Sequence, residues 1–221
     1  MTPARDFLKL YRLMFCRFGH QHWWPGDTPF EICVGAILTQ NTSWQNVEKA
    51  IANLKKNRCL SLQKIDAMPP AELAELIRPA GYFNIKTKRL QNFTSHVKKN
   101  HHGRLADMFR QSEKILRNEL LDISGIGPET ADSIILYAAG KASFVIDAYT
   151  RRVFSRHGLC DKDADYHDLK KLCEDNLPHD TELFNDYHAQ LVAVAKKYCK
   201  TKPVCKGCPL ENFLRKSKYD D

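Results

Sequence analysis

Apolar side chains recur every three or four positions along most of this chain, which is the spacing of one face of an α-helix. The first such pattern begins at Phe7 and predicts a helix that ends near Gly19. The segment Thr28-Pro29-Phe30-Glu31 combines a capping box with a proline in the first turn and predicts the start of a second helix. A longer pattern begins at Asn84 and closes at 100–103. No segment alternates as a half-buried strand does, so the pattern predicts an all-α protein.

Shorter periodic segments fill the rest of the chain and raise the expected number of helices to roughly a dozen. They lie at or near the following positions: Val47, 62–68, 70–77, Leu105, Ile115, Ile134, Val153, Leu169 and Leu191. Neither internal repeats nor low-complexity linkers interrupt them.

A glycine-rich turn divides this helical pattern near the middle of the chain. Apolar residues end one helix at 120–123, Gly125 and Gly127 follow, and Pro128 suits the first position of a new helix. Glycines lack a Cβ, so their backbone N–H groups can approach a ligand closely, and the new helix adds donors with a partial positive charge. Such donors suit a phosphate. The alternative is a tight turn between helices that binds nothing.

The composition favours a polyanionic partner. The 221 residues include 34 Lys and Arg against 26 Asp and Glu, a formal net charge of +8. A basic surface attracts nucleic acids and acidic membranes. The sequence has no 18-residue apolar run, and its first six residues lack the apolar core of a signal peptide. We therefore expect a monomeric protein of the cytoplasm that is associated with the nucleoid and not with a membrane.

Residues 120–157 resemble the helix-hairpin-helix and catalytic-aspartate signature of the endonuclease III superfamily of DNA base-excision glycosylases. The resemblance implies two helical lobes with the active cleft between them. One is a six-helix domain over 20–140, and the other combines 1–19 with 141–221. Double-stranded DNA that contains damaged bases is the implied partner.

Two acidic residues carry the chemistry that this resemblance implies. Asp147 matches the aspartate that assists cleavage of the N-glycosidic bond, where a carboxylate stabilises the oxocarbenium character of the sugar and orients the attacking water. On local grounds Asp147 is an N-cap for residues 148–150, and the two roles are compatible. Glu129 replaces the lysine whose amine forms a Schiff base in members that also nick DNA. A carboxylate cannot form an imine, so we expect a monofunctional glycosylase. Glu129 is then a second candidate catalytic residue or only a favourable acid in the first turn of a helix.

All three tryptophans, Trp23, Trp24 and Trp44, lie close together in the sequence. Aromatic residues usually belong to the core, yet two adjacent indoles in a loop flanked by Gly and Pro cannot easily both face one core. Together with the motif at 125–132 they resemble the 3-methyladenine DNA glycosylase branch, which implies an aromatic pocket for a flipped alkylpurine. An N3-alkylated adenine is formally cationic, so stacking on indole adds a cation–π energy of about 0.5–2 kcal/mol that normal bases lack.

The same resemblance implies residues that hold the duplex open. Extruding a base costs a few kcal/mol, and Tyr82 matches the wedge that enters the stack, with Phe83 packed behind it. Gln40 matches the residue that fills the vacated space. We expect Lys86 to hold a flanking phosphate, although a charge run is more often a solvated face. An ordinary turn capped by Asn84 is the alternative for this segment. In the hairpin, Gly125, Gly127 and Thr130 are the expected DNA contacts.

Three cysteines near the C-terminus, Cys199, Cys205 and Cys208, predict a metal site. The superfamily's [4Fe–4S] loop uses four cysteines with gaps of six, two and five residues, whereas this chain has five residues in the first gap and Leu214 at the fourth position. Three interpretations stay open: a [4Fe–4S] cluster with an atypical fourth ligand, a zinc site, or a basic loop without metal. Cys16, Cys33 and Cys173 fall inside helical patterns and are expected to be buried thiols, while Cys160 and Cys173 are possible fourth ligands if the fold brings them near.

Two rival functions stay open. The first differs from this prediction in its substrate, and the second differs in its class of function. The protein could excise another lesion or a mismatched base, or it could be a non-catalytic helix-hairpin-helix module that only grips duplex backbone. Asp147 and the tryptophans argue against pure binding, since binding requires neither.

Overall fold

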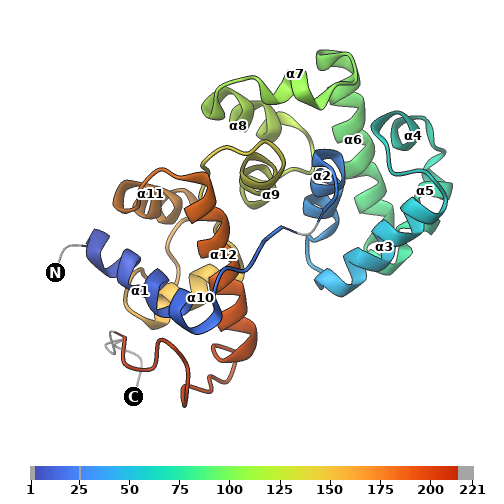
Figure 1. The fold of residues 1–221 in the computed structure, drawn as a ribbon. Coiled ribbons are helices and arrows are strands. Elements are labelled where there is room, and N and C mark those ends of the chain that lie inside the picture. The colour runs from blue at the N-terminus through green and yellow to red at the C-terminus, as the bar shows by residue number, and fades with distance from the viewer. Residues whose placement is uncertain (1–2, 25, 214–221) are drawn as a thin grey trace. The chain divides into compact units, whose positions relative to one another are not determined.

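The computed structural model describes residues 3–24 and 26–213, and over these ranges the chain consists of helices and turns without a β-strand (Figure 1). The prediction of an all-α fold is confirmed. The chain forms two compact units. The central unit is Trp24–Lys141, and the terminal unit combines Met1–Trp23 with Ala142–Asp221.

Several helices of the central unit begin with a polar cap or a proline. Thr28 Oγ1 accepts from the Glu31 N–H at 3.2 Å, as the capping-box pattern predicts, and Ser61 and Ser112 cap later helices in the same way. The elements of this unit are α2 (Pro29–Leu38), α3 (Trp44–Lys56), α4 (Leu62–Ala67), α5 (Pro70–Leu76), the 3₁₀ turn η1 (Arg78–Ala80), α6 (Phe83–His101), α7 (Leu105–Phe109), α8 (Glu113–Asp122), α9 (Pro128–Ser133) and the π-helical turn η2 (Ile134–Ala138).

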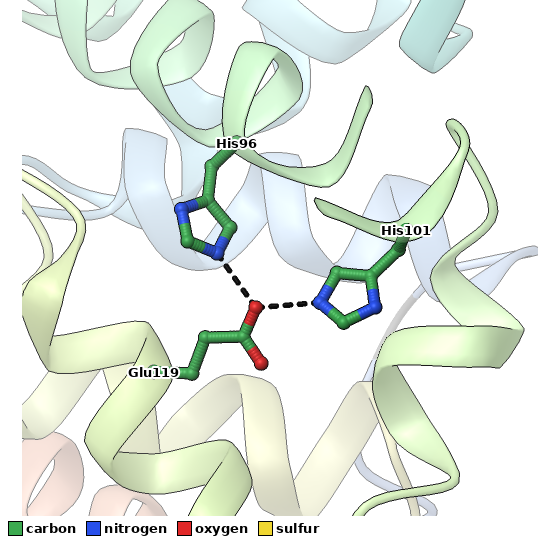
Figure 2. A group of neighbouring side chains, drawn as sticks. All are labelled: His96, His101 and Glu119. Atoms are coloured by element: carbon green, nitrogen blue, oxygen red, sulfur yellow. Dashed lines mark hydrogen bonds and ion pairs between the residues drawn. The ribbon is translucent and has the colours of Figure 1, made fainter. Parts of the chain in front are cut away.

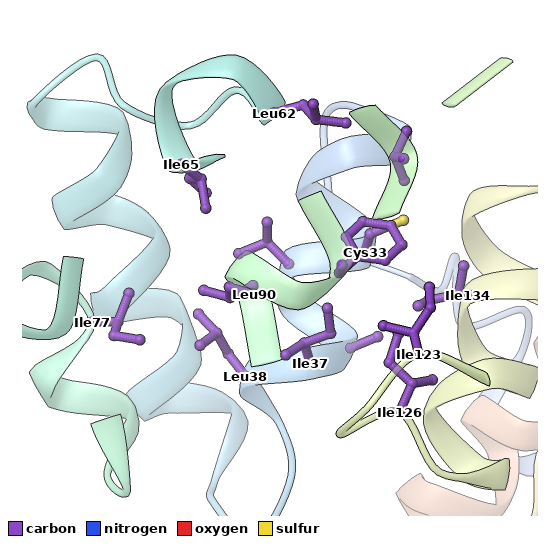
Figure 3. Close-up of a cluster of buried hydrophobic side chains, with 14 of the residues drawn as sticks. Cys33, Ile37, Leu38, Leu62, Ile65, Ile77, Leu90, Ile123, Ile126 and Ile134 are labelled. Carbon is purple, nitrogen blue, oxygen red and sulfur yellow. The ribbon is translucent and has the colours of Figure 1, made fainter. Parts of the chain in front are cut away.

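One apolar core holds the central unit together (Figure 3). Helix α6 packs against α2, α4, α5 and α7, and its Leu90 and Phe93 are fully buried together with Ile37 and Ile134. Burying one such side chain stabilises the fold by about 1.5–3 kcal/mol. Because the core extends to Ile123 and Ile126, it also anchors the turn between α8 and α9.

The segment after α9 departs from the predicted α-helix. Residues Ile134–Ala138 form a π-helical turn, and the Ala139 N–H donates to the Ile134 carbonyl at 3.0 Å. The sequence pattern predicted an ordinary helix here, because apolar periodicity does not distinguish α from π geometry over five residues. A π turn changes the direction of the side chains that follow it, and such turns occur often at functional sites.

The terminal unit contains α1 (Pro3–Phe18), α10 (Ala148–Arg156), α11 (Tyr166–Asn176) and α12 (Thr181–Lys197). Its core is aromatic: Phe7 packs edge-on against Phe154 at 5.3 Å, and Phe144 packs against Tyr187 at 5.5 Å between ring centroids. The Tyr187 hydroxyl donates to the Phe7 carbonyl at 2.8 Å. Residues from the two ends of the chain therefore complete one core.

A buried carboxylate in α12 fixes the segment after α1. Asp186 is 2% exposed. It accepts from the Tyr11 hydroxyl at 3.0 Å and from the Gln21 N–H at 2.7 Å. Burial and the hydrogen bond to Asp186 raise the pKa of Tyr11 above its ordinary value.

Among the described residues, no helix has the length and apolar character needed to cross a bilayer.

Candidate functional site

The glycine turn between α8 and α9 is closed by the Ile126 N–H, which donates to the Ile123 carbonyl at 3.0 Å. Gly125 has a φ of +99°, which favours glycine. A Cβ built on Gly125 would lie 2.4 Å from Cγ of Arg89. Gly127 has a φ of −93° and open space at its Cβ position. The local geometry therefore requires a glycine at 125 but not at 127.

A polar network ties the loop after α2 to this hairpin. The Gln40 Nε2 donates to the Gly125 carbonyl at 3.1 Å and to Thr130 Oγ1 at 2.8 Å. Arg89 Nη1 donates to the Gln40 Oε1. Both ends of the Gln40 carboxamide thus form hydrogen bonds. The Arg89 side chain lies beneath Gly125, where an added Cβ would clash with it.

An ion pair brackets the same hairpin. Arg117 on α8 donates to both carboxylate oxygens of Asp132 on α9, from Nε at 2.8 Å and from Nη2 at 3.2 Å. Asp132 is fully buried. Removing one partner of such a pair leaves a buried charge without compensation, which typically costs about 3–5 kcal/mol. The pair therefore holds α8 and α9 at a fixed spacing across the turn.

Three aromatic side chains of the central unit form what we call the aromatic wall: Trp24, Trp44 and Tyr137. The ring centroid of Trp24 lies 5.0 Å from that of Trp44 and 4.8 Å from that of Tyr137. A Cβ on Gly35 in α2 would lie 3.3 Å from Cη2 of Trp44 and 3.5 Å from Nε1 of Trp24. A helical glycine costs about 1 kcal/mol relative to alanine, and here it gives both indoles room against α2. Trp23 belongs to the terminal unit, and its role in a base pocket stays a prediction.

Asp147 is the N-cap of α10 in the terminal unit. Its Oδ1 accepts from the Thr150 N–H at 2.7 Å, and its Oδ2 lies 3.4 Å from Nε2 of His188 on α12. The side chain of Asp147 is 14% exposed, and that of His188 is 5% exposed. The cap that the sequence predicted is confirmed, and the histidine beside the second carboxylate oxygen is an addition to the prediction.

The pKa of Asp147 results from opposing effects. Burial raises it, whereas the electrostatic interaction and hydrogen bonding with His188 and the hydrogen bonds with Thr150 lower it. The net pKa lies below the ordinary value of an aspartate. The carboxylate is therefore ionised throughout the neutral range, as a group that stabilises a developing cation must be.

The predicted wedge turn lies at the start of α6. Tyr82 has a φ of 45° and is 68% exposed. Phe83 is partly buried against the core, with the Arg78 guanidinium 4.6 Å from its ring centroid. An exposed tyrosine in a strained backbone conformation is uncommon without a functional reason. The arrangement agrees with Phe83 packed behind Tyr82, while the wedge role itself stays a prediction.

The structure corrects the role predicted for Lys86. We predicted that it holds a DNA phosphate, but it is 1% exposed, and its Nζ donates to the carbonyls of Leu38 at 2.8 Å and Ala80 at 2.7 Å. Burial and the charge of Arg89 lower its pKa to about 8. The amine joins the end of α2 to the turn before Tyr82. It is therefore a structural cation, and the helical pattern of charged residues gave no sign of its inward direction.

Replacing Lys86 with methionine should destabilise the protein, because two buried carbonyls lose their donor, at about 1–3 kcal/mol. A lysine pKa lowered by folding costs stability below about pH 8, and the cost is relieved as the pH rises. Between pH 7 and pH 10, the free energy of unfolding of the wild type should therefore rise by about 2 kcal/mol relative to that of Lys86→Met. Urea unfolding at several pH values measures this difference. The exposed Lys88→Met is the matched control and should show a constant difference; a constant difference for Lys86→Met would contradict the burial.

Residues 34–179 match the family model of the HhH-GPD superfamily of base excision DNA repair proteins. The chain belongs to this superfamily. It is therefore a DNA glycosylase of base excision repair, and the endonuclease III resemblance inferred from its sequence is confirmed.

Individual relatives extend over nearly the whole of this glycosylase. A Methanocaldococcus jannaschii protein, named as a candidate DNA repair glycosylase, is 49% identical over 207 residues, 93% of this chain and 94% of its own. The structure of H. pylori 3-methyladenine DNA glycosylase bound to 1,N6-ethenoadenine has a TM-score of 0.74 at 28% identity, covering 89% of this chain and 98% of its own. An endonuclease III–DNA complex has a TM-score of 0.82 at 22% identity, covering 97% and 96%, and shows the shared fold.

The cysteine loop of this glycosylase does not offer four thiolates. Cys199 is buried and receives a hydrogen bond from Arg156 Nη1 to its Sγ at 3.2 Å, while Cys205 is exposed. In the described part of the chain, the three loop thiols do not form a group whose ligand atoms all lie within 4.8 Å. Leu214, at the position of the family's fourth cysteine, lies outside the described residues. The metal site of Cys199, Cys205 and Cys208 stays a prediction, and the proposed reaction does not require it.

Sequence reasoning missed two residues of the site. His188 lies within an apolar helical run, where a single histidine carries no local signal. Tyr137 was counted only as part of an apolar helix, since nothing in the sequence shows that the following turn directs it toward Trp24. Glu129, by contrast, is exposed in the first turn of α9, where both of its predicted roles remain compatible with its position.

Proposed function

We propose that this protein is a monofunctional DNA glycosylase that removes alkylated purines such as 3-methyladenine. The aromatic wall against Gly35 is the observation that carries the proposal. Aromatic faces stack on any base, but they add cation–π attraction only for a cationic one. The 28% identity to a 3-methyladenine DNA glycosylase supports the same substrate class.

In the proposed reaction, water adds to C1′ of the deoxyribose as the bond from C1′ to the purine nitrogen breaks. The base leaves with the bonding electrons, and a cationic alkylpurine thereby becomes neutral without an external acid. Asp147 stabilises the positive charge on the sugar and orients the water, whose proton passes to the carboxylate or to solvent. Its ionised state and its fixed oxygens suit this role.

We assign the grip on double-stranded DNA to the hairpin and the wedge turn. Gly125 and Gly127 would meet the phosphate backbone, and Thr130, whose side chain is buried, would support them through its hydrogen bond with Gln40. Tyr82 would enter the stack, and Gln40 would reach the vacated space from its place beside the hairpin. The net charge of +8 favours such binding at low salt. The proposed working form is a monomer on chromosomal DNA in the cytoplasm.

Chromatographic measurement of base release tests the proposed substrate. Purified protein is incubated with methylated DNA, with DNA that contains oxidised pyrimidines and with duplexes that contain mismatched thymine or adenine. We expect 3-methyladenine to be released in preference to the other bases. Preferential release of an oxidised or mismatched base would replace the substrate while leaving the superfamily assignment intact.

The glutamate at position 129 predicts that no covalent intermediate forms. Incubation with lesion-containing duplex and borohydride should trap no protein–DNA complex, because a carboxylate cannot form the imine that borohydride reduces. The product should be an intact strand with an abasic site, which breaks only after alkali treatment. A superfamily member with lysine at this position serves as the positive control. Efficient trapping of this protein would contradict the monofunctional proposal and would mean that another amine of the chain attacks the sugar.

A further inference from the structure

Two histidines and a glutamate of the central unit converge at a place that the proposed reaction does not use (Figure 2). His96 and His101 lie on the last turns of α6, and Glu119 lies on α8. The Nε2 atoms of both imidazoles point to one oxygen of the glutamate, Oε1, at 2.7 Å from His96 and 2.5 Å from His101. The three potential ligand atoms all lie within 4.8 Å of one another.

The cluster is partly withdrawn from solvent yet still accessible. The exposed fractions of the side chains are 21% for His96, 14% for His101 and 18% for Glu119. Gln111 Nε2 donates to the other glutamate oxygen, Oε2, and holds the carboxylate in place, while Asn100 Nδ2 lies beside the His96 ring, 3.2 Å from Nδ1 and 3.1 Å from Nε2. Such outer hydrogen bonds orient the first ligands in metal sites.

We propose that His96, His101 and Glu119 form a binding site for a divalent transition metal ion, with Zn²⁺ as the best match. Two imidazole nitrogens and one carboxylate oxygen are a known zinc ligand set. With metal–ligand bonds of about 2.0–2.2 Å in a tetrahedral arrangement, neighbouring ligand atoms lie roughly 3.3 Å apart. The present separations need to open by less than about 1 Å, which small side-chain rotations achieve.

Charge and protonation also fit a divalent ion. The Nε2–H tautomer of each imidazole can donate to the carboxylate, whereas the other tautomer presents the Nε2 lone pair that a metal ion would take. Each imidazole would then carry its proton on Nδ1, and the Asn100 carboxamide can turn its oxygen toward Nδ1 of His96. The carboxylate halves the charge of the ion. Among the described residues three potential ligands converge, so a tetrahedral ion would hold water at its remaining position.

The position of the site gives the metal a structural role. It would clip the C-terminal end of α6 to α8, the helix that leads into the glycine hairpin. A bound ion would thus hold the hairpin's supporting helix in place without touching the reacting sugar. Binding of an ion to the folded state alone raises the melting temperature, and the rise grows with the logarithm of the ion concentration above the dissociation constant.

Metal titration of the 221-residue chain tests the site. After removal of metal with a chelator, Co²⁺ is added while the visible spectrum is recorded, and Zn²⁺ affinity is measured by competition with a chromophoric chelator. To remove the contribution of the cysteine loop, both measurements are repeated in Cys205→Ser/Cys208→Ser. We expect one equivalent to bind in that background, with the weak visible bands of nitrogen and oxygen ligands. Zn²⁺ at 100 times its dissociation constant should raise the melting temperature by about 5–10 °C.

Single substitutions locate the ion. Glu119→Gln and His96→Gln, chosen to preserve hydrogen bonding, should each weaken binding by about 10–100-fold. His102→Asn is the matched control, because His102 is exposed beside the cluster, and asparagine tolerates its positive φ of 54°. Binding weaker than about 10 µM in the Cys205→Ser/Cys208→Ser background, or binding unchanged by Glu119→Gln and His96→Gln, would overturn the proposal.

Discussion

Asp147→Asn should lower the rate of base release by about 10²–10³-fold while duplex affinity stays within about threefold of the wild type. Asparagine keeps the size of the side chain and the oxygen that caps the Thr150 N–H, so α10 keeps its start. It removes the negative charge that stabilises the sugar cation, and it weakens the electrostatic interaction with His188. Single-turnover base release and equilibrium duplex binding, measured on the same preparation, separate chemistry from binding.

Asp165→Asn provides the matched control for this experiment. Asp165 caps α11 in the same terminal unit, with its Oδ1 accepting from the His167 N–H at 2.7 Å. Asp165 has no role in the proposed reaction, so base release by Asp165→Asn should stay near the wild-type rate. A similar loss in both variants would indicate a folding effect. Full activity of Asp147→Asn would remove this carboxylate from the mechanism.

Gly125→Ala should destabilise the protein by about 2–4 kcal/mol and strongly weaken duplex binding. Two effects combine: alanine is strained at a φ of +99°, and its methyl group would meet Cγ of Arg89 at 2.4 Å. Moving the Arg89 side chain would disturb its hydrogen bond to Gln40, and with it the network that ends on Thr130. Urea unfolding and fluorescence-based duplex binding measure the two losses.

Gly127→Ala distinguishes folding from DNA contact. Its φ is −93°, and no atom lies within 4 Å of the added Cβ, so the stability should change by less than about 1 kcal/mol. If the hairpin approaches phosphate as closely as proposed, the new methyl group should still weaken duplex binding about tenfold or more. Equal binding by Gly127→Ala and wild type would place the DNA backbone elsewhere. Equal stability of Gly125→Ala and wild type would contradict the hairpin geometry.

The sequence predicted the helices well where local chemistry determines them. Thr28 and Pro29 begin α2 because a hydroxyl cap and a fixed φ act within one turn, and the same holds for Pro128 at α9. The cap at Asp147 follows the same rule. These features depend on neighbours a few residues away, so a single sequence contains what is needed to predict them.

Features that depend on distant partners could not be predicted in this way. Lys86 turns inward because the carbonyl oxygens of Leu38 and Ala80 come close in space, and no helical charge pattern reports their position. His188 lies 41 positions from Asp147 along the sequence, and only the packing of α10 against α12 brings them together. The cluster at His96 likewise requires α6 and α8 to meet.

The discontinuous make-up of the terminal unit also affects how the protein must be made. Helix α1 leaves the ribosome well before α12, yet Phe7 receives its hydrogen bond from Tyr187, 180 residues later. At synthesis rates of about 5–20 residues per second, the nascent helix waits roughly 10–40 s with its apolar stripe uncovered. Trp24–Lys141 can complete its own core during this interval. Biosynthesis thus orders the assembly, and the early helix is the segment that a chaperone would shield.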